Sequence, residues 1–220
     1  MMHITIQNLI KIENEIKKNL SNLNIVNLPK IIAVSKTFKI DKILPLIDYG
    51  HIDFGENKIQ EAVDKWTEIK SKNKNIKLHM IGKLQTNKVK FAVKLFDYIH
   101  SVDSKKLAKK ISDEQSKIDK KIKIFIQVNI GNEEQKSGIN KIELEDLVSY
   151  CKKINLDVIG LMCIPPAGKD ASVYFKEINL LNNSFDFNEL SMGMSSDYIE
   201  ASKNSASYLR IGSSIFGKRA

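Results

Sequence analysis

Short apolar runs alternate with longer amphipathic segments along almost the whole chain. The apolar runs are rich in isoleucine, valine, leucine and phenylalanine, which is typical of strands buried on both faces of a sheet. The strongest of them is KIKIFIQVNI, at residues 121–130. We predict eight strands, at residues 30–36, 52–57, 77–84, 98–103, 121–130, 156–164, 189–194 and 208–217.

An amphipathic helix is predicted in every gap between these strands, and one more precedes the first strand. In residues 6–23, apolar side chains recur at spacings of three and four, which places them on one face of a helix. Asp41 and Thr86 are predicted to cap the helices that follow them. The predicted helices cover residues 6–23, 41–50, 58–71, 87–96, 104–118, 141–154, 171–183 and 196–206.

Strict alternation of strands and helices predicts an α/β protein with a parallel sheet covered by helices. Eight such units in 220 residues fit a closed (β/α)8 TIM barrel, near the lower end of the ~250 residues usual for this fold. The alternative, a doubly wound open sheet, more often needs about five or six strands. We therefore expect a single TIM barrel with an extra N-terminal helix, forming one domain over residues 1–220.

Composition and the start of the chain indicate a cytoplasmic protein. Hydrophobic residues make up 42% of the chain and charged residues 28%, which are ordinary values for a soluble globular protein. No apolar run approaches the ~20 residues needed to cross a bilayer. The opening MMHITIQNLI lacks the basic start and the long apolar core of a signal peptide.

The cysteines and histidines give no sign of a metal site. Cys151 and Cys163 form no CxxC pair, and the four histidines show no metal-ligand spacing. We expect no bound metal. The more ordinary role for His79, on the third strand, is that of a core histidine with satisfied hydrogen bonds, and for Cys163 that of a small core residue.

The formal net charge of +9 raises the question of a nucleic-acid partner. Only two of the 35 basic residues are arginine, Arg210 and Arg219, and the lysines are scattered among glutamate and aspartate. The densest basic stretch, residues 70–77, has no interleaved aromatic residues on which bases could stack. We therefore expect no nucleic-acid partner.

Polar residues follow the strands at the end of the barrel where active sites lie, at the carboxyl ends of the strands. Ser191 lies in the seventh strand, Ser195 and Ser196 follow it, and Gly212 and Ser213 belong to the eighth. Glycine lets backbone N–H groups approach a phosphate closely, serine hydroxyls donate to it, and Ser196 is predicted to open the next helix. Loops after these two strands often bind phosphate in barrels, although such loops are also common as plain turns.

Three further residues complete a set of chemical groups at this end. Lys36 ends the first strand, Asn57 ends the second, and Arg210 lies inside the last strand of a chain that uses lysine nearly everywhere else. A lysine whose pKa is lowered by desolvation and a nearby arginine can form a Schiff base with an aldehyde. Arg210 either forms a structural ion pair or donates to a ligand heteroatom. Lysine for an aldehyde, arginine for a ring nitrogen and Gly/Ser loops for a phosphate together describe pyridoxal 5′-phosphate.

Nine sequence blocks, in order over nearly the whole chain, also carry a family resemblance. They are AVSKT (33–37), DFGEN (53–57), HMIGKLQTNK (79–88), SVD (101–103), QVNI (127–130), KSGI (136–139), GLMCIPP (160–166), LSMGMSSD (190–197) and RIGSSIFG (210–217). In these blocks the chain resembles the pyridoxal phosphate homeostasis proteins, small single-domain relatives of the barrel of bacterial alanine racemase.

The resemblance implies a role for each of these side chains. Lys36 would hold pyridoxal phosphate as a Schiff base and Arg210 would face the pyridine nitrogen. Ser191, Ser195, Gly212 and Ser213 would surround the phosphate. The departures from the family pattern are Lys83 in place of proline, Ser196 of SMGMSSD in place of aspartate and Cys163 in place of alanine. Lys83 places an extra charge near the mouth of the barrel.

The expected function is that of a carrier, with no catalytic residues. An arginine opposite the pyridine nitrogen keeps that nitrogen unprotonated, which makes the ring a weaker electron sink. No tyrosine ends a strand, and the chain ends at Ala220, before any second domain that could supply one. The protein would buffer pyridoxal phosphate or deliver it to apo-enzymes that require it, as a monomer without a membrane partner. A weak amino-acid racemase is the alternative, and a class I aldolase is a third hypothesis.

Overall fold

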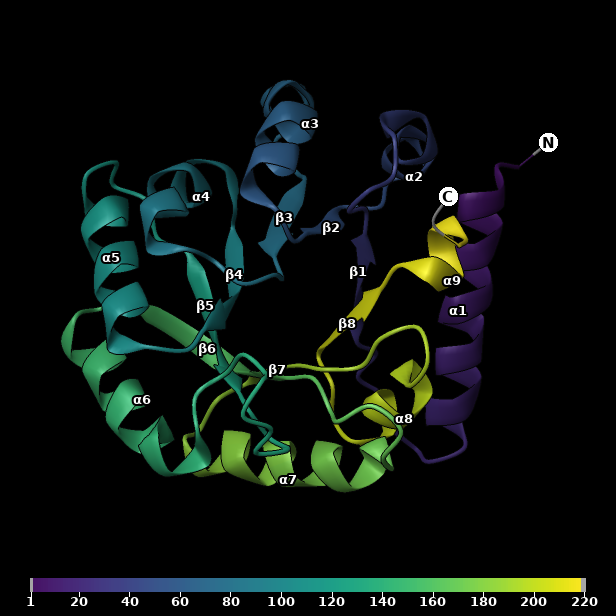
Figure 1. The fold of residues 1–220 in the computed structure, drawn as a ribbon. Helices are drawn as coiled ribbons and strands as arrows, with labels where there is room; N and C mark the ends of the chain where they lie inside the picture. Colours follow the sequence, from purple (N-terminus) through teal and green to yellow (C-terminus); the bar gives the residue numbers. More distant parts are fainter. Residues whose placement is uncertain (1, 219–220) are drawn as a thin grey trace.

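The computed structural model describes residues 2–218, and its eight strands close into a parallel barrel (Figure 1). Each strand pairs with its neighbours in sequence, and β8 returns to pair with β1. The predicted (β/α)8 barrel is confirmed. Met1, Arg219 and Ala220, which belong to the domain expected over residues 1–220, lie outside the described residues. The strands are β1 (Lys30–Val34), β2 (Asp53–Glu56), β3 (Lys77–Met80), β4 (Tyr98–Val102), β5 (Lys123–Val128), β6 (Asp157–Cys163), β7 (Glu189–Ser191) and β8 (Tyr208–Ile211).

Helices surround the barrel, and the predicted N-terminal helix is present. The first and the last helix lie side by side (Figure 1), where the Asn8 side-chain amide donates to the Ile215 carbonyl at 2.9 Å. No helix within residues 2–218 combines the length and the apolar character that a membrane span requires. The α-helices are α1 (Ile4–Ser21), α2 (Leu44–Asp48), α3 (Ile59–Lys72), α4 (Val89–Leu95), α5 (Lys105–Ser116), α6 (Leu144–Lys153), α7 (Ala171–Ser184), α8 (Tyr198–Lys203) and α9 (Ser213–Phe216).

Three of these helices are preceded by short 3-10 turns: η1 (Ile40–Lys42), η2 (Thr86–Lys88) and η3 (Lys141–Glu143). Because of the first two turns, both predicted helix caps were wrong. Asp41 lies inside η1, because α2 begins only at Leu44, next to a proline whose missing N–H suits a first turn. Thr86 lies inside η2, and neither that turn nor α4 has a side-chain cap.

Three further expectations were wrong near the carboxyl ends of the last strands. The eighth strand was predicted to continue to residue 217, but it ends at Ile211, and residues 213–216 form α9. Ser196 does not open a helix, since α8 begins at Tyr198 with Asp197 as its N-cap residue. The seventh strand also ends early, at Ser191, and Gly193 then takes a positive φ of 83° that an extended strand cannot contain.

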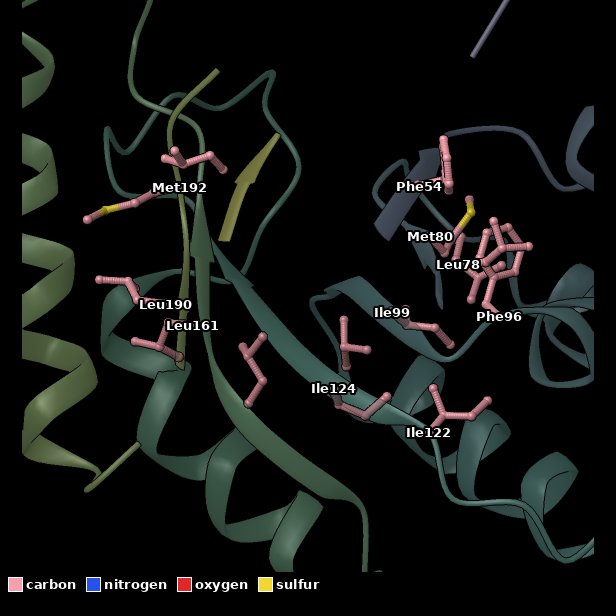
Figure 2. Packing of buried hydrophobic residues seen from close by; sticks show 14 of the residues in the cluster. Phe54, Leu78, Met80, Phe96, Ile99, Ile122, Ile124, Leu161, Leu190 and Met192 are labelled. Atoms are coloured by element: carbon pink, nitrogen blue, oxygen red, sulfur yellow. The ribbon is translucent and has the colours of Figure 1, made fainter. Parts of the chain in front are cut away.

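Two apolar layers hold the barrel together. The larger layer lies between the strands and the helices, and Figure 2 shows part of it, including Leu161 and Leu190, which are register partners on β6 and β7. The smaller layer fills the barrel interior with side chains from strands around the ring, among them Tyr98, Phe125 and Tyr208. Because side chains alternate across a strand, Arg210 points to the same side as Tyr208, into the barrel.

Gly193 is expected to tolerate no side chain. A Cβ atom there would meet the Ala201 Cβ at 2.5 Å, in addition to the strain of a positive φ. Gly193→Ala should therefore lower the free energy of unfolding by about 3 kcal/mol, measured by urea denaturation. Gly168 is the matched control, because its φ is 73° but a Cβ would meet nothing within 4 Å. Gly168→Ala should cost only about 1 kcal/mol, and equal losses would contradict the steric argument.

Candidate functional site

A cavity of about 500 Å³ opens at the carboxyl ends of the barrel strands. Its volume lies in the range of about 300–1,000 Å³ that is usual for small-molecule sites. The loops after strands at both ends of the sequence meet on its wall, as the barrel topology requires. Six of the seven predicted binding residues line it: Lys36, Asn57, Ser195, Arg210, Gly212 and Ser213.

The backbone on both sides of Lys36 is fastened to α3. The N–H of Thr37 donates to the Glu61 carboxylate, and the Lys65 ammonium donates to the Ser35 carbonyl at 2.9 Å. Thr37 has a φ of 68°, which is strained for a β-branched residue and is typical of functional sites. These contacts fix the direction in which the half-buried Lys36 leaves the barrel wall.

A buried carboxylate underlies this segment. Glu56, at the end of β2, accepts hydrogen bonds through Oε1 from the Ser35 hydroxyl at 2.7 Å, from Lys65 at 3.0 Å and from the Trp66 indole at 3.0 Å. Lys65 supplies the positive charge that a buried carboxylate requires. The turn that carries Lys36 is therefore held by side chains from β2 and α3. The sequence around Lys36 does not indicate these supporting residues.

Arg210 lies in the floor of the cavity and is only 4% exposed. Its Nη1 donates to the Ser191 hydroxyl at 2.7 Å, and its Nη2 donates to the Cys163 carbonyl at 2.8 Å. Burial lowers the pKa of the guanidinium below its ordinary value. Both contacts are neutral acceptors, so the structural ion pair considered as an alternative is not formed by any carboxylate within residues 2–218.

Ser191 lies below the cavity rather than on its wall. Its side chain is fully buried, accepts from Arg210, and lies 2.9 Å from Nδ1 of His100. These contacts make Ser191 a support for the arginine. Because Ser191 does not line the cavity, its contact with a phosphate stays a prediction that the geometry of the cavity does not support.

The loops after β7 and β8 join at the cavity, where the Ser195 hydroxyl accepts from the Ser214 N–H at 3.3 Å. Asn57 enters the same cavity, and its Oδ1 is buried without a hydrogen-bond partner among residues 2–218. A buried acceptor left in this way costs about 1–3 kcal/mol. A ligand that donates to Asn57 would offset this cost, so the wall fits a polar ligand.

Two histidines fill the barrel interior beneath this site. His79 Nε2 lies 2.9 Å from an Asp53 carboxylate oxygen, and His79 Nδ1 lies 2.9 Å from Nε2 of His100. The interpretation of His79 as a core histidine with satisfied hydrogen bonds is confirmed. His100 was not singled out from the sequence, since only the pairing of β3 with β4 brings it next to His79.

These two histidines, together with His51, should make folding stability depend on pH. Burial lowers the pKa of His51, His79 and His100 below the ordinary 6.5. As pH falls through 6.5 the unfolded chain gains protons that the folded protein does not, so the free energy of unfolding should fall. The loss approaches about 1.4 kcal/mol per pH unit for each histidine.

Urea denaturation at about pH 7.5, 6.5 and 5.5 measures this dependence. The His100→Gln variant lacks one of the three groups and should show a shallower slope. Equal stability at the three pH values in the natural protein would contradict the neutral state of the buried rings.

Other side chains at this end of the barrel play no visible part in the cavity. Cys163 is fully buried, which confirms it as a core residue, and burial raises the pKa of its thiol to about 12. Lys83 is exposed and does not line the cavity. Tyr98 and Tyr208 are the first residues of β4 and β8, so they lie at the amino ends of these strands and away from the cavity. No tyrosine of the described chain lines the cavity. Residues 2–218 contain no group of three histidine, cysteine or acidic side chains placed to hold a metal.

Comparisons with known proteins identify relatives of this chain. Residues 13–220 match the family model described as the alanine racemase N-terminal domain. The pyridoxal phosphate homeostasis protein of Haemophilus influenzae is 34% identical over 95% of this chain and 92% of its own. That of Aquifex aeolicus is 36% identical over 88% of each chain.

Two solved structures share the fold. PipY of Synechococcus elongatus, solved with PLP bound, is 30% identical, covers 92% of this chain and all of its own, and superposes with a TM-score of 0.81. Alanine racemase of Clostridium difficile, at 13% identity and a TM-score of 0.70, shows the barrel alone and covers 92% of this chain and 55% of its own. The chain therefore belongs to the pyridoxal phosphate homeostasis protein family, within the larger family of the alanine racemase N-terminal domain.

Proposed function

We propose that this protein binds pyridoxal 5′-phosphate reversibly through Lys36 and serves pyridoxal phosphate homeostasis as a carrier or buffer. The observation that carries this proposal is the single cavity that gathers Lys36, Arg210, Gly212 and Ser213 from opposite ends of the sequence. The names of the relatives and the PLP-bound structure of PipY support it.

The wall of the cavity matches the three functional groups of such a ligand. Pyridoxal phosphate supplies an aldehyde that a lysine amine captures as a Schiff base, together with a ring nitrogen and a phosphate. Lys36 is the amine on the wall, held in direction by the fastened turn around it. Arg210 is the planar donor for the ring nitrogen, and Ser195, Gly212 and Ser213 are the groups for the phosphate.

The same wall favours a carrier over a racemase. An amino-acid racemase needs a second acid or base on the other face of the ring, and no tyrosine of residues 2–218 lines the cavity. Arg210, always a donor, leaves the ring nitrogen unprotonated and the ring a poor electron sink. The protein would therefore hold its ligand without robust turnover and release it to apo-enzymes that require it. We propose that it does so as a cytoplasmic monomer of one domain.

Two assays on the loaded protein separate these functions. Proton exchange at the α-carbon of D- and L-amino acids in heavy water reports racemase chemistry. Recovery of activity in an added pyridoxal phosphate-dependent apo-enzyme reports release. The proposal expects recovery and no exchange above the rate with free pyridoxal phosphate. Exchange that requires Lys36 would instead identify a racemase. Size-exclusion chromatography with light scattering tests the monomer.

A further inference from the structure

A continuous row of hydrogen bonds runs through the barrel interior from one end towards the other. Asp53 Oδ1 lies 2.9 Å from His79 Nε2, and His79 Nδ1 lies 2.9 Å from His100 Nε2. His100 Nδ1 lies 2.9 Å from the Ser191 oxygen, which accepts from Arg210 at 2.7 Å. The row therefore joins the start of β2 to the arginine in the floor of the cofactor cavity.

The carboxylate at one end of the row, together with neutral rings, fixes the direction of every bond in it. At the other end Arg210 donates to the Ser191 oxygen, and the serine hydroxyl keeps its own proton for Nδ1 of His100, the nitrogen that a neutral His100 has left to accept. A carboxylate only accepts, so His79 donates to Asp53 through Nε2 and accepts at Nδ1. Nε2 of His100 is then the donor between the two rings.

Neutral rings are required for this arrangement, because each histidine donates through one nitrogen and accepts through the other. Burial lowers the pKa of His79 and holds that of His100 well below its ordinary value, which agrees with neutral rings. The rings are also fixed in orientation. His79 stacks on Tyr98 with centroids 4.2 Å apart, and His100 stacks on Phe125 at 4.3 Å.

We propose that Asp53, His79 and His100 are positioning residues that act on the cofactor through Arg210. This inference rests on the proposed binding of pyridoxal phosphate. The buried guanidinium donates to the Ser191 oxygen, and the Ser191 hydroxyl in turn donates away from Arg210, towards His100. The row of donors then ends on the Asp53 carboxylate. No proton moves along the row. The fixed direction of its hydrogen bonds orients Arg210 and stabilises the guanidinium charge. The carboxylate at the far end stays away from the ring nitrogen of the cofactor.

The far end of the row opens to a second cavity. The Asp53 side chain is 13% exposed and lines a cavity of about 420 Å³ at the amino ends of the strands, together with Lys30 and His51. The negative charge that ends the row is thus accessible from the face opposite the cofactor. A change of charge at Asp53 is therefore expected to alter the cofactor site, although Asp53 does not line that site.

The first test needs no cofactor. Long-range proton–nitrogen NMR spectra of the protein with labelled histidine, at about pH 7, identify the protonated nitrogen of each ring. The proposal expects His79 and His100 to be neutral and protonated at Nε2. Protonation of either ring at Nδ1 alone, or a charged ring, would overturn the direction of the row and with it the proposal.

The second test titrates the protein with pyridoxal phosphate. Asp53→Asn keeps an acceptor for His79 but removes the charge, and binding should weaken roughly three- to ten-fold. The pH midpoint of the bound absorbance band should fall, because a more positive barrel disfavours the protonated chromophore. Glu13→Gln, which removes a carboxylate that lines the same far cavity outside the row, is the control and should leave both unchanged.

The outcomes separate this inference from the proposed function. Failure of the natural protein to bind pyridoxal phosphate would overturn the proposed function. Normal binding by the natural protein, with affinity and midpoint unchanged in Asp53→Asn, would overturn the positioning role alone. Circular dichroism checks the fold of the variant, and the tautomer measurement on the natural protein remains decisive if the variant does not fold.

Discussion

Replacement of Lys36 by alanine is expected to abolish covalent capture of pyridoxal phosphate completely. The loaded natural protein should absorb near about 420 nm, the region of a lysine-bound form of this cofactor. The variant should bind pyridoxal phosphate only through its ring and phosphate, without that band and without any label fixed by borohydride. Absorbance spectroscopy before and after borohydride measures the loss.

The fold of the Lys36 variant should remain intact, because the side chain lies at the rim of the cavity and is outside the apolar layers. Its free energy of unfolding should stay within about 0.5 kcal/mol of the natural value. Lys83→Ala is the matched control, since Lys83 is an exposed lysine at the same end and does not line the cavity. An unfolded Lys36 variant, or a retained band that borohydride fixes, would contradict the assignment.

Replacement of Arg210 by lysine is expected to weaken cofactor binding about ten-fold or more and to shift the absorbance band. Lysine keeps the positive charge but loses the planar fork that reaches Ser191 and the Cys163 carbonyl together. At least one of these buried acceptors then lacks a donor, which should also lower the free energy of unfolding by about 1–3 kcal/mol. Titration with pyridoxal phosphate and urea denaturation give the two quantities.

A double-mutant cycle shows whether the arginine acts together with its support. Ser191→Ala removes the hydroxyl between Arg210 and His100 and should itself weaken binding. The losses in Arg210→Lys and Ser191→Ala should not add, because both break the same hydrogen bond. An unchanged spectrum in Arg210→Lys, or simple additivity, would remove the arginine from its proposed place.

The barrel could be predicted because its signal is local. Each buried strand is a short apolar run, each helix has its own periodicity, and strict alternation leaves few arrangements. The limits of the elements were less predictable. Residues 208–217 were predicted to form one strand, yet the chain turns at Gly212 and forms α9 against α1, a contact between the two ends of the chain. The cap at Asp41 failed for a different, local reason, since Pro45 favours a helix start at Leu44.

Six residues on the cavity wall were also predictable, because each lies near or beyond the carboxyl end of a strand and the barrel brings these positions together. Lys36 and Arg210 stood out by type and place. Their supports did not. Glu61 reaches Thr37 from α3, and His100 reaches Ser191 across the barrel, so both depend on helix placement and strand register. No feature of the local sequence distinguishes such a histidine or glutamate from an ordinary one.

The central claim is that Lys36 captures pyridoxal phosphate, and mass spectrometry tests it most directly. The natural protein is loaded with pyridoxal phosphate, reduced with borohydride, digested and mapped. The account predicts one pyridoxyl phosphate label, on the peptide that contains Lys36 and on that lysine. A protein that remains colourless and unlabelled after loading, or a label spread over surface lysines with none on Lys36, would contradict it.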